Sequence, residues 1–283
     1  MTPAATSRRL PAHQWGLRQC RRIDRIYRGR VTMNPEFSSR VAYKFGGYSS
    51  GAQRTEVFPD GDPEDAFDDL AIGLGRPGAR LVDVGCADGR NVLRVAPAFT
   101  SVLGIDLSMA MLESAGRHRE TRGLDHVEFE LRDASGTGLP DGDVDVVTSR
   151  RGPLFPDEFR RILKPGGSLI YLGIGEQDVR ELKETFGRGR LHGRWNGRPV
   201  ARETAEQLTD AGFTVVAEKA FFYEEFFHSP TDLDTFLQQV PIFEDYDPVA
   251  DRGPFDRYVA SAAGSCGVRL ARHWFLLHAR KAA

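Results

Sequence analysis

Three aspartates, Asp83, Asp106 and Asp133, lie at the ends of successive short apolar runs of this sequence. A carboxylate in the place of Asp106 can accept hydrogen bonds from both hydroxyls of a ribose, and one in the place of Asp133 can accept the amino group of an adenine. Each aspartate alone has a structural alternative, because Asp also begins turns, caps helices and lies in solvent. Three such positions in this order are rarer by chance than any one of them, and together they indicate a nucleoside-binding site.

The first aspartate opens a glycine-rich turn, 83-DVGCADG-89. Gly85 and Gly89 let the backbone turn sharply and let a ligand approach without a Cβ in the way, although a tight strand-to-helix turn is the plain alternative. The spacing is G-x-A-x-G, which differs from the G-x-G-x-x-G of dinucleotide-binding turns. The Lys-Ser/Thr pair of a phosphate-binding loop is absent as well, so the ligand is expected to be neither a dinucleotide nor a nucleoside triphosphate.

These residues need a scaffold, and apolar runs alternate with helix-like segments from residue 80 onward. Such alternation predicts right-handed βαβ units and a doubly wound parallel sheet, in which ligands bind beyond the carboxyl ends of the strands. Ser108 is the expected N-cap of the second helix. The expected strands are 80–86, 101–108, 126–134, 143–152 and 168–175, and the expected helices are 89–99, 108–120 and 156–167.

The flanking segments are less regular. Residues 43–67 are rich in Gly, Pro and acids and are expected to form a loop, in which Tyr43 and Tyr48 can act as a flap over a neighbouring site. The apolar run 268–280 is expected to form a long last strand at the edge of the sheet. Before it, the sequence predicts a helix at 203–213, a strand at 213–223, and an insertion with helices at 231–240 and about 254–264.

With these motifs in place, residues 75–180 resemble a class I S-adenosylmethionine-dependent methyltransferase. Members carry an acidic-x-Gly-x-Gly-x-Gly loop, and 83-DVGCADG-89 is similar to it with Ala87 in place of the middle glycine. Asp106, in 104-GIDLSMAML-112, matches the acidic ribose-binding residue, and Asp133 matches the residue that meets the adenine amino group. The phrase 159-FRRILKPGGSLIY-171 resembles the helix, turn and fifth strand of many members.

The resemblance implies a Rossmann-like, doubly wound, seven-stranded and mostly parallel sheet, with an antiparallel last strand. It also implies S-adenosyl-L-methionine as the cofactor, with the loop near its amino-acid end. There Asp83 can pair with the ammonium group or hold the loop through hydrogen bonds, and Cys86 is a small residue under the cofactor rather than a nucleophile. The cofactor contacts expected on this basis are Asp83, Gly85, Cys86, Ala87, Gly89, Asp106, Leu107, Met111, Asp133, Ala134 and Ser149.

The segment 148-TSRRGPLF-155 follows the fourth expected strand and is expected to face the substrate. It lacks the Asn/Asp-Pro-Pro-aromatic motif of amino-directed nucleic-acid methyltransferases. Arg150 and Arg151 have two interpretations, an anion-binding pair that contacts the substrate, or surface arginines of a loop. Tyr43 and Tyr48 complete the candidate substrate contacts. No residue is singled out as a catalytic base, and His228 is expected to be structural.

The composition argues against a disulfide-stabilised, zinc-binding or membrane-spanning protein. The three cysteines are scattered, which argues against a disulfide framework or a zinc site, so no metal is expected. The chain has no run of 18 apolar residues, so no membrane span is expected, and a cytoplasmic location is favoured. Residues 1–32 hold eight arginines and one acid, a net charge of +7. Because the whole chain has a net charge of −2, the other 251 residues carry a net charge of −9.

We therefore expect a basic extension at 1–32 and a methyltransferase domain at 33–283, with a helical lid insertion at about 224–266. The favoured function is methylation of a small molecule such as a specialised metabolite, because the body of the chain is acidic. Methylation of ribosomal or transfer RNA is the alternative, in which the basic extension, Arg150 and Arg151 would contact the phosphates of the RNA. A non-catalytic cofactor-binding protein is the second alternative. The sequence leaves the oligomeric state open.

Overall fold

A computed structural model describes residues 35–45 and 51–283, which belong to one compact unit. The predicted basic extension at 1–32 and Tyr48 lie outside the described residues. No helix in the described part is long and apolar enough to cross a membrane. No group of three or more His, Cys, Asp or Glu side chains in those same ranges is placed to hold a metal ion.

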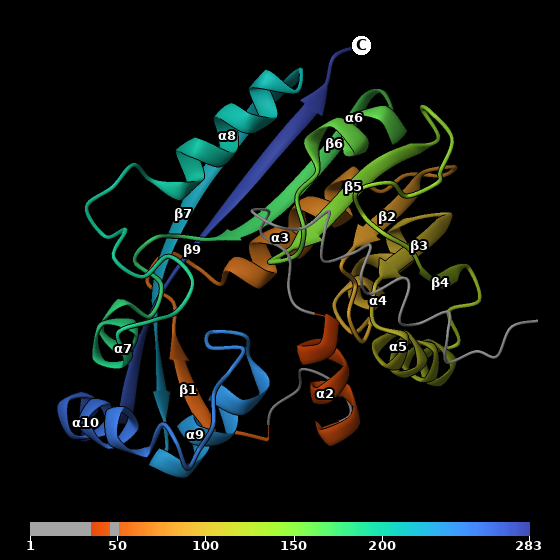
Figure 1. Ribbon diagram of the computed structural model, residues 1–283. Coiled ribbons are helices and arrows are strands. Elements are labelled where there is room, and N and C mark those ends of the chain that lie inside the picture. Colours follow the sequence, from red (N-terminus) through yellow and green to blue (C-terminus); the bar gives the residue numbers. More distant parts are fainter. Residues whose placement is uncertain (1–34, 46–50) are drawn as a thin grey trace, which may run out of the picture. The chain divides into compact units, whose positions relative to one another are not determined.

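The chain folds around one mixed sheet (Figure 1) with the strand order β1-β7-β9-β6-β5-β2-β3-β4. Strands β4, β3, β2, β5 and β6 are parallel, and β9 pairs antiparallel with both β6 and β7. The strands are β1 (Arg54–Val57), β2 (Arg80–Val84), β3 (Ser101–Asp106), β4 (Val127–Leu131), β5 (Val144–Arg150), β6 (Leu163–Ile174), β7 (Phe213–Phe227), β8 (Ala263–Gly264) and β9 (Gly267–Lys281).

Strand order reverses between β2 and β5, which is where such sheets bind ligands. The predicted doubly wound, mostly parallel class is confirmed, but the expected count of seven strands is too low. The described residues form nine strands, because β1 adds to the outer edge of β7 and the two-residue β8 pairs with β9. The seven remaining strands make the expected core with an antiparallel last strand.

The expected edge position of the last strand is wrong, because β9 lies between β6 and β7. Its residues 273–279 are all buried, so both of its faces and both of its edges are covered. An apolar strand of this kind gains more from an inner place than from an edge, where its backbone groups would be unpaired. The sequence shows the apolar run but not which strands flank it.

Helices cover the sheet and connect its strands. The helices are α2 (Pro35–Phe45), α3 (Pro63–Leu74), α4 (Val92–Val95), η1 (Ala96–Ala98), α5 (Met109–Arg122), α6 (Pro156–Ile162), α7 (Arg180–Phe186), α8 (Val200–Asp210), α9 (Pro230–Gln239) and α10 (Arg252–Ala262). Ser108 caps α5 as predicted, since its side chain accepts a hydrogen bond from the backbone N–H of Met111. On one face of the sheet, Phe67 and Ala71 of α3 pack with Leu93 of α4 in the main apolar core.

Two further expectations change with the structure. The region expected to be loop, 43–67, contains the end of α2, the whole of β1 and the start of α3. The N-terminus of α3 is stabilised because Asp62 accepts a hydrogen bond from the Glu64 N–H and Pro63 occupies the first turn. The helix expected at 156–167 ends at Ile162, and β6 begins at Leu163, before the Pro-Gly-Gly turn.

The segment between β7 and β9 contains α9 and α10. Residues 224–227 still pair with β9, so the inserted segment runs from 228 to 266 and starts slightly later than the expected 224. In Figure 1 the long strands β7 and β9 run down to these two helices. Leu233, Phe236 and Phe255 of the helices form a second apolar core with Phe227 and Leu270 of the strands.

Candidate active site

The glycine-rich loop leaves β2 at Val84 and is tied to β3. The backbone N–H groups of Gly85 and Cys86 both donate to the Ile105 carbonyl, at 2.8 and 3.0 Å. Gly85 and Gly89 have φ of +71° and +73°, in the left-handed region that favours glycine. A Cβ on Gly89 would lie 2.6 Å from the Phe129 ring, and one on Gly85 would lie 2.8 Å from Pro153. Close packing therefore requires both glycines even before a ligand is considered.

Asp106 fixes the loop through its two oxygens. Its Oδ2 accepts a hydrogen bond from the Ala87 N–H at 2.9 Å, and its Oδ1 accepts one from the Ser108 N–H at 2.8 Å. Burial raises the pKa of this carboxyl, and the hydrogen bonds from these N–H groups oppose the shift in part. Each oxygen has a second lone pair, so the carboxylate can also accept hydroxyl groups of a ligand. Ala87 itself has a φ of +48°, a strained value for a residue with a side chain.

Asp83 is buried at the end of β2. Its Oδ1 accepts a hydrogen bond from the Thr148 hydroxyl at 2.7 Å. Burial raises the pKa of Asp83 to about 6, although the Thr148 bond opposes this. Burial likewise raises the pKa of the Cys86 thiol well above its usual value, so Cys86 is a buried apolar contact rather than a nucleophile.

The remaining expected cofactor contacts lie beside the loop. Asp133 accepts a hydrogen bond from the Ser135 N–H at 2.8 Å, next to the buried Ala134. Ser149 is buried and donates to the Pro153 carbonyl at 2.8 Å. Met111 is fully buried and packs with Phe37 and Val41 of α2. Leu107 lies between Asp106 and the cap Ser108.

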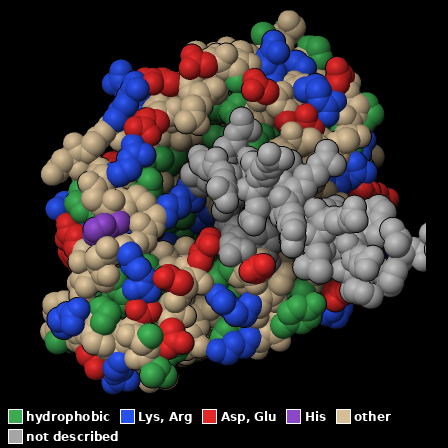
Figure 2. Space-filling view, in the orientation of Figure 1, with side chains coloured by type: hydrophobic (Ala, Val, Ile, Leu, Met, Phe, Trp, Pro, Cys, Tyr) green, Lys and Arg blue, Asp and Glu red, His purple; other side chains and the backbone are tan. Residues whose placement is uncertain are grey.

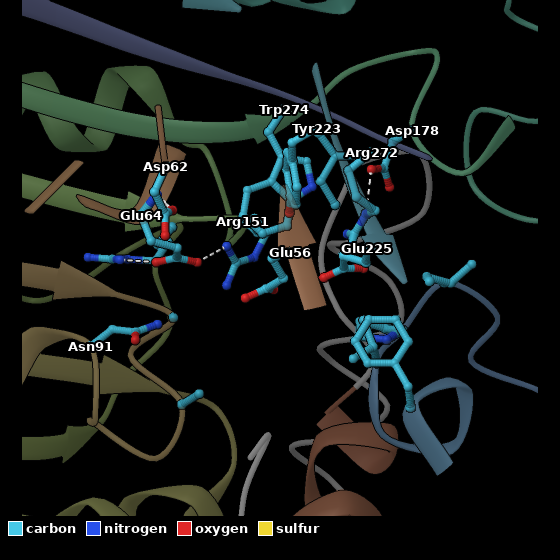
Figure 3. A pocket seen from close by; sticks show the side chains of 18 of the residues that line it. Glu56, Asp62, Glu64, Asn91, Arg151, Asp178, Tyr223, Glu225, Arg272 and Trp274 are labelled. Carbon is cyan, nitrogen blue, oxygen red and sulfur yellow. Dashed lines mark hydrogen bonds and ion pairs between the residues drawn. The ribbon is translucent and has the colours of Figure 1, made fainter. Parts of the chain in front are cut away.

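A cavity of about 520 Å³ starts at the loop and crosses the carboxyl ends of the central strands. Its volume is in the range of small-molecule sites. Figure 3 shows Asn91, Asp62 and Glu64 at one end, Asp178, Arg272 and Glu225 at the other, and Arg151, Tyr223 and Trp274 between them. We call these the loop end and the far end. Of the expected site residues, the cavity brings together Asp83, Gly85, Cys86, Ala87, Arg150 and Arg151.

Other expected residues do not line this cavity. Tyr43 is on α2 and is 81% exposed, so the structure gives it no contact with the cavity. The residues of the cofactor set that lie outside the lining are Gly89, Asp106, Leu107, Met111, Asp133, Ala134 and Ser149.

Arg150 lines the cavity, but carboxylates of this chain bind its guanidinium. Its side chain is only 6% exposed and is bound by Glu64 and by Asp68, at 2.5 Å for the latter, and its guanidinium lies 4.2 Å above the Phe67 ring. It therefore joins β5 to α3, the helix that the sequence analysis missed. Arg151 and Arg150 outweigh the effect of burial on Glu64 and lower the pKa of that carboxyl to about 2.

Arg151 also lines the cavity. Its guanidinium binds Glu64 and lies 4.2 Å from the centre of the Trp274 ring. The residue has a φ of +54°. The described residues contain four non-glycine residues with positive φ, and Ala87, Arg151 and Leu191 of these line the cavity, while Val179 follows the lining residue Asp178. Strained backbone at one place is typical of functional sites.

Sequence reasoning missed the far end. Arg272 is buried between Asp178 and Glu225, at 2.9 and 2.7 Å. Arg54 of β1 adds a contact to Glu225 at 3.2 Å. The available signal was charge inside apolar strands, because Arg272 interrupts the last apolar run and Glu225 interrupts an aromatic one. Such charges are stable in the interior only when they are paired.

Comparison with known proteins identifies the domain. Residues 81–167 match the family model of a methyltransferase domain, a stretch that includes the loop, Asp106 and Asp133. Nocamycin O-methyltransferase of Saccharothrix syringae is 37% identical over 109 residues, which cover 35% of this chain and 39% of that protein. The 2-methyl-6-phytyl-1,4-hydroquinone methyltransferase of Synechocystis sp. is 30% identical over 149 residues, which cover 50% of this chain and 43% of that protein. The matches thus span less than half of either relative.

Solved structures extend the likeness to most of the chain. A protein from Bacillus halodurans C-125 superposes with a TM-score of 0.60 at 18% identity, covering 79% of this chain and 100% of that one. The [4+2]-cyclase SpnF superposes with a TM-score of 0.53 at 23% identity, covering 88% and 92%. These likenesses show the fold alone. The match over the loop and its aspartates shows that residues 81–167 are similar to a methyltransferase domain, in agreement with the resemblance of this segment to class I S-adenosylmethionine-dependent methyltransferases.

Proposed function

We propose that this protein transfers a methyl group from S-adenosylmethionine to a small molecule. The observation that carries the proposal is the continuous cavity, which begins at the family's cofactor loop and ends at a separate, chemically distinct far end. One cavity of this size can hold the two reactants of a methyl transfer side by side, which is the main contribution a protein makes to such a reaction.

The loop end suits the cofactor. Asp83, which lines this end, would face the amino-acid portion, while Asp106 and Asp133, beside the loop but outside the lining, would accept the ribose hydroxyls and the adenine amino group. The described residues leave one buried oxygen there without a hydrogen-bond partner, Asp88 Oδ2, whose nearest cation is Arg90 at 3.7 Å. A buried, unsatisfied oxygen beside a cavity is a place for a ligand donor. When bound, S-adenosylmethionine would supply an electrophilic methyl group; the chain orients the reactants and excludes water.

The middle of the cavity and its far end suit the acceptor. Tyr223 and Trp274 form an aromatic wall, with ring centres 5.3 Å apart, and Phe58 lies 4.9 Å from Tyr223. Aromatic walls of this kind bind flat or apolar molecules. Two relatives are named for methylation of small molecules, nocamycin and a phytyl hydroquinone, which supports the same substrate class here. On the face shown in Figure 2, basic and acidic side chains are interspersed rather than gathered into a basic patch, which favours a small molecule over RNA.

Calorimetry tests the cofactor half of the proposal. The full chain should bind S-adenosylmethionine or its demethylated product, and Asp106→Ala should weaken binding about tenfold or more, because a buried charged acceptor is lost. Asp106→Asn keeps one acceptor oxygen and should lie between the two. Asp125→Ala, outside the site, is the matched control. Failure of the wild-type chain to bind either compound would overturn the assignment of the loop.

Methyl transfer from labelled cofactor to pooled metabolites and pooled RNA tests the other half. Transfer to a metabolite pool is the expected result. Transfer to RNA, lost on deletion of residues 1–32, would favour the RNA alternative instead. Cofactor binding without transfer to any pool would favour a non-catalytic protein, since a fold that binds a cofactor is shared by proteins of different function.

A further inference from the structure

Seven cationic side chains line the cavity, and two of them differ from the rest. Five make ion pairs with carboxylates of the described residues: Arg54, Arg94, Arg150, Arg151 and Arg272. Lys183 and Arg190, both at the far end, make no ion pair within 4.0 Å in that same part of the chain. Unpaired cations inside a cavity are costly unless an anion neutralises them.

Lys183 is only 3% exposed. Its Nζ donates to the backbone carbonyl of Asp178 at 2.8 Å, which leaves two donors of the ammonium group. Burial lowers the pKa of Lys183 to about 8; Asp178 opposes the shift, and the neighbouring charges of Arg272 and Arg190 add to it. The group is thus close to cations as well as to one carboxylate.

Arg190 is directed to the same place by an unusual backbone. Gly189 and Leu191, on either side of it, have φ of +111° and +66°. A Cβ on Gly189 would lie 3.2 Å from Lys183 Cγ and 2.9 Å from the Phe243 ring, so this turn packs directly on the lysine stem. The Arg190 side chain is exposed to solvent within the cavity, while the protein around it lowers the pKa of the guanidinium. Tyr171 is its hydrogen-bond partner.

The charges of the described residues that line the far end do not cancel. Four cations, Arg54, Lys183, Arg190 and Arg272, face three carboxylates, Glu56, Asp178 and Glu225. A fourth carboxylate, Glu244, acts on Arg190 from outside the lining. Within the lining one positive charge remains, which a ligand with a single negative charge would balance. Apolar side chains border the same end: Phe236, Val240, Pro241 and Ile242.

We propose that the methyl acceptor is a small organic acid, whose carboxylate is bound by Lys183 and Arg190 while its apolar body packs on the wall of Phe236 and Ile242. This inference rests on the proposed function and specifies its substrate class. Arg190 presents a planar fork that matches a carboxylate, and Lys183 adds a further charge-assisted hydrogen bond. The acceptor would then be anchored at the far end, with the rest of the molecule extending towards the loop.

Matched acids and amides test the site without knowledge of the natural substrate. Phenylacetate, coumarate and octanoate, each beside its primary amide, would be titrated into the full chain with and without S-adenosylhomocysteine, and followed by calorimetry. We expect at least one acid to bind about tenfold more tightly than its amide. In Arg190→Gln and Lys183→Met this advantage should fall below about threefold, with the affinity for the amide unchanged. Arg180→Gln, an exposed arginine of α7, should keep the preference.

Equal affinity for acid and amide, no binding of any acid, or a preference that survives in both variants would overturn the proposal. Because Lys183 is buried, its variant is first compared with the wild type by thermal unfolding; if it does not fold, Arg190→Gln alone decides. An acid preference in a chain that binds no cofactor would contradict the proposed function but keep the anion site. Cofactor binding without acid preference would do the reverse.

Discussion

At the scale of single residues, the site holds ionisable groups in environments that oppose their charge. Asp83 is buried beside Thr148, and Lys183 is buried beside Arg190 and Arg272. Such groups are unfavourable for stability and are retained where a ligand makes use of them. The effect is measurable for Asp83, because the pKa of its carboxyl is about 6 in the folded chain and 3.8 without the surrounding protein.

Asp83 should make stability fall as pH rises. Its pKa is about 6 in the folded chain against an ordinary value of 3.8, so between these values the folded state holds a proton that the unfolded state has lost. The free energy of unfolding should therefore decrease between about pH 4 and pH 6, by about 3 kcal/mol in total. Asp83→Asn keeps an acceptor for Thr148 and removes this pH-dependent change in the free energy of unfolding.

Urea unfolding of both chains at pH 4.5 and pH 7.5, without ligand, checks this expectation. The difference between variant and wild type should shift in favour of Asp83→Asn at the higher pH. A difference that does not change with pH would show that Asp83 titrates normally in the folded chain.

At the scale of elements, α3 is positioned by charges from another part of the chain. Glu64 and Asp68 of α3 bind Arg150 of β5, more than 80 residues later, and Asp68 also binds Arg94 at 2.7 Å. In the sequence, 63-PEDAFDDL-70 is acidic and turn-like, so a helix packed on the core was not predicted. Its buried carboxylates are stable only because arginines pair with them, and the sequence spacing does not show that these arginines lie nearby.

Replacing Arg150 should therefore affect stability more than cofactor binding. Arg150→Met leaves two carboxylates in a largely buried position with less compensation, and breaking such pairs costs about 3 kcal/mol or more. The double change Glu64→Gln with Asp68→Asn in the Arg150→Met background should recover part of the loss, because the uncompensated charges are removed. Arg76→Met is the control, since that arginine is 66% exposed and its buried partner Asp145 keeps a second ion pair with Lys164. Chemical denaturation measures all three; a loss for Arg150→Met no larger than for the control would contradict this role.

At the scale of the whole molecule, the half of the sheet that carries the loop could be predicted from the sequence, and the half that builds the far end could not. The strands β2 to β6 alternate with helices at short range, so apolar periodicity was enough to predict them, and the loop with Asp106 and Asp133 came with them. The far end is built from β7, β9 and the segment after β6, whose register pairs residues about 40 to 70 positions apart. Arg272 and Glu225 meet only through that register, and no local pattern contains it.

This division also predicts how the two ends respond to ligands. The N–H groups of Gly85 and Cys86 are held by Ile105, and that of Ala87 by Asp106, so a ligand on Asp106 stabilises the loop through bonds that already exist. S-adenosylhomocysteine should slow hydrogen exchange at residues 84–91 and leave 183–191 nearly unchanged. An acid that binds Lys183 and Arg190 should do the opposite, because exchange follows the free energy of local opening. Both ligands together should protect both segments, and Asp106→Ala should abolish only the first effect. If either ligand alone protected both ends equally, the cavity would have to respond as one unit, and the assignment of separate cofactor and acceptor ends would be wrong.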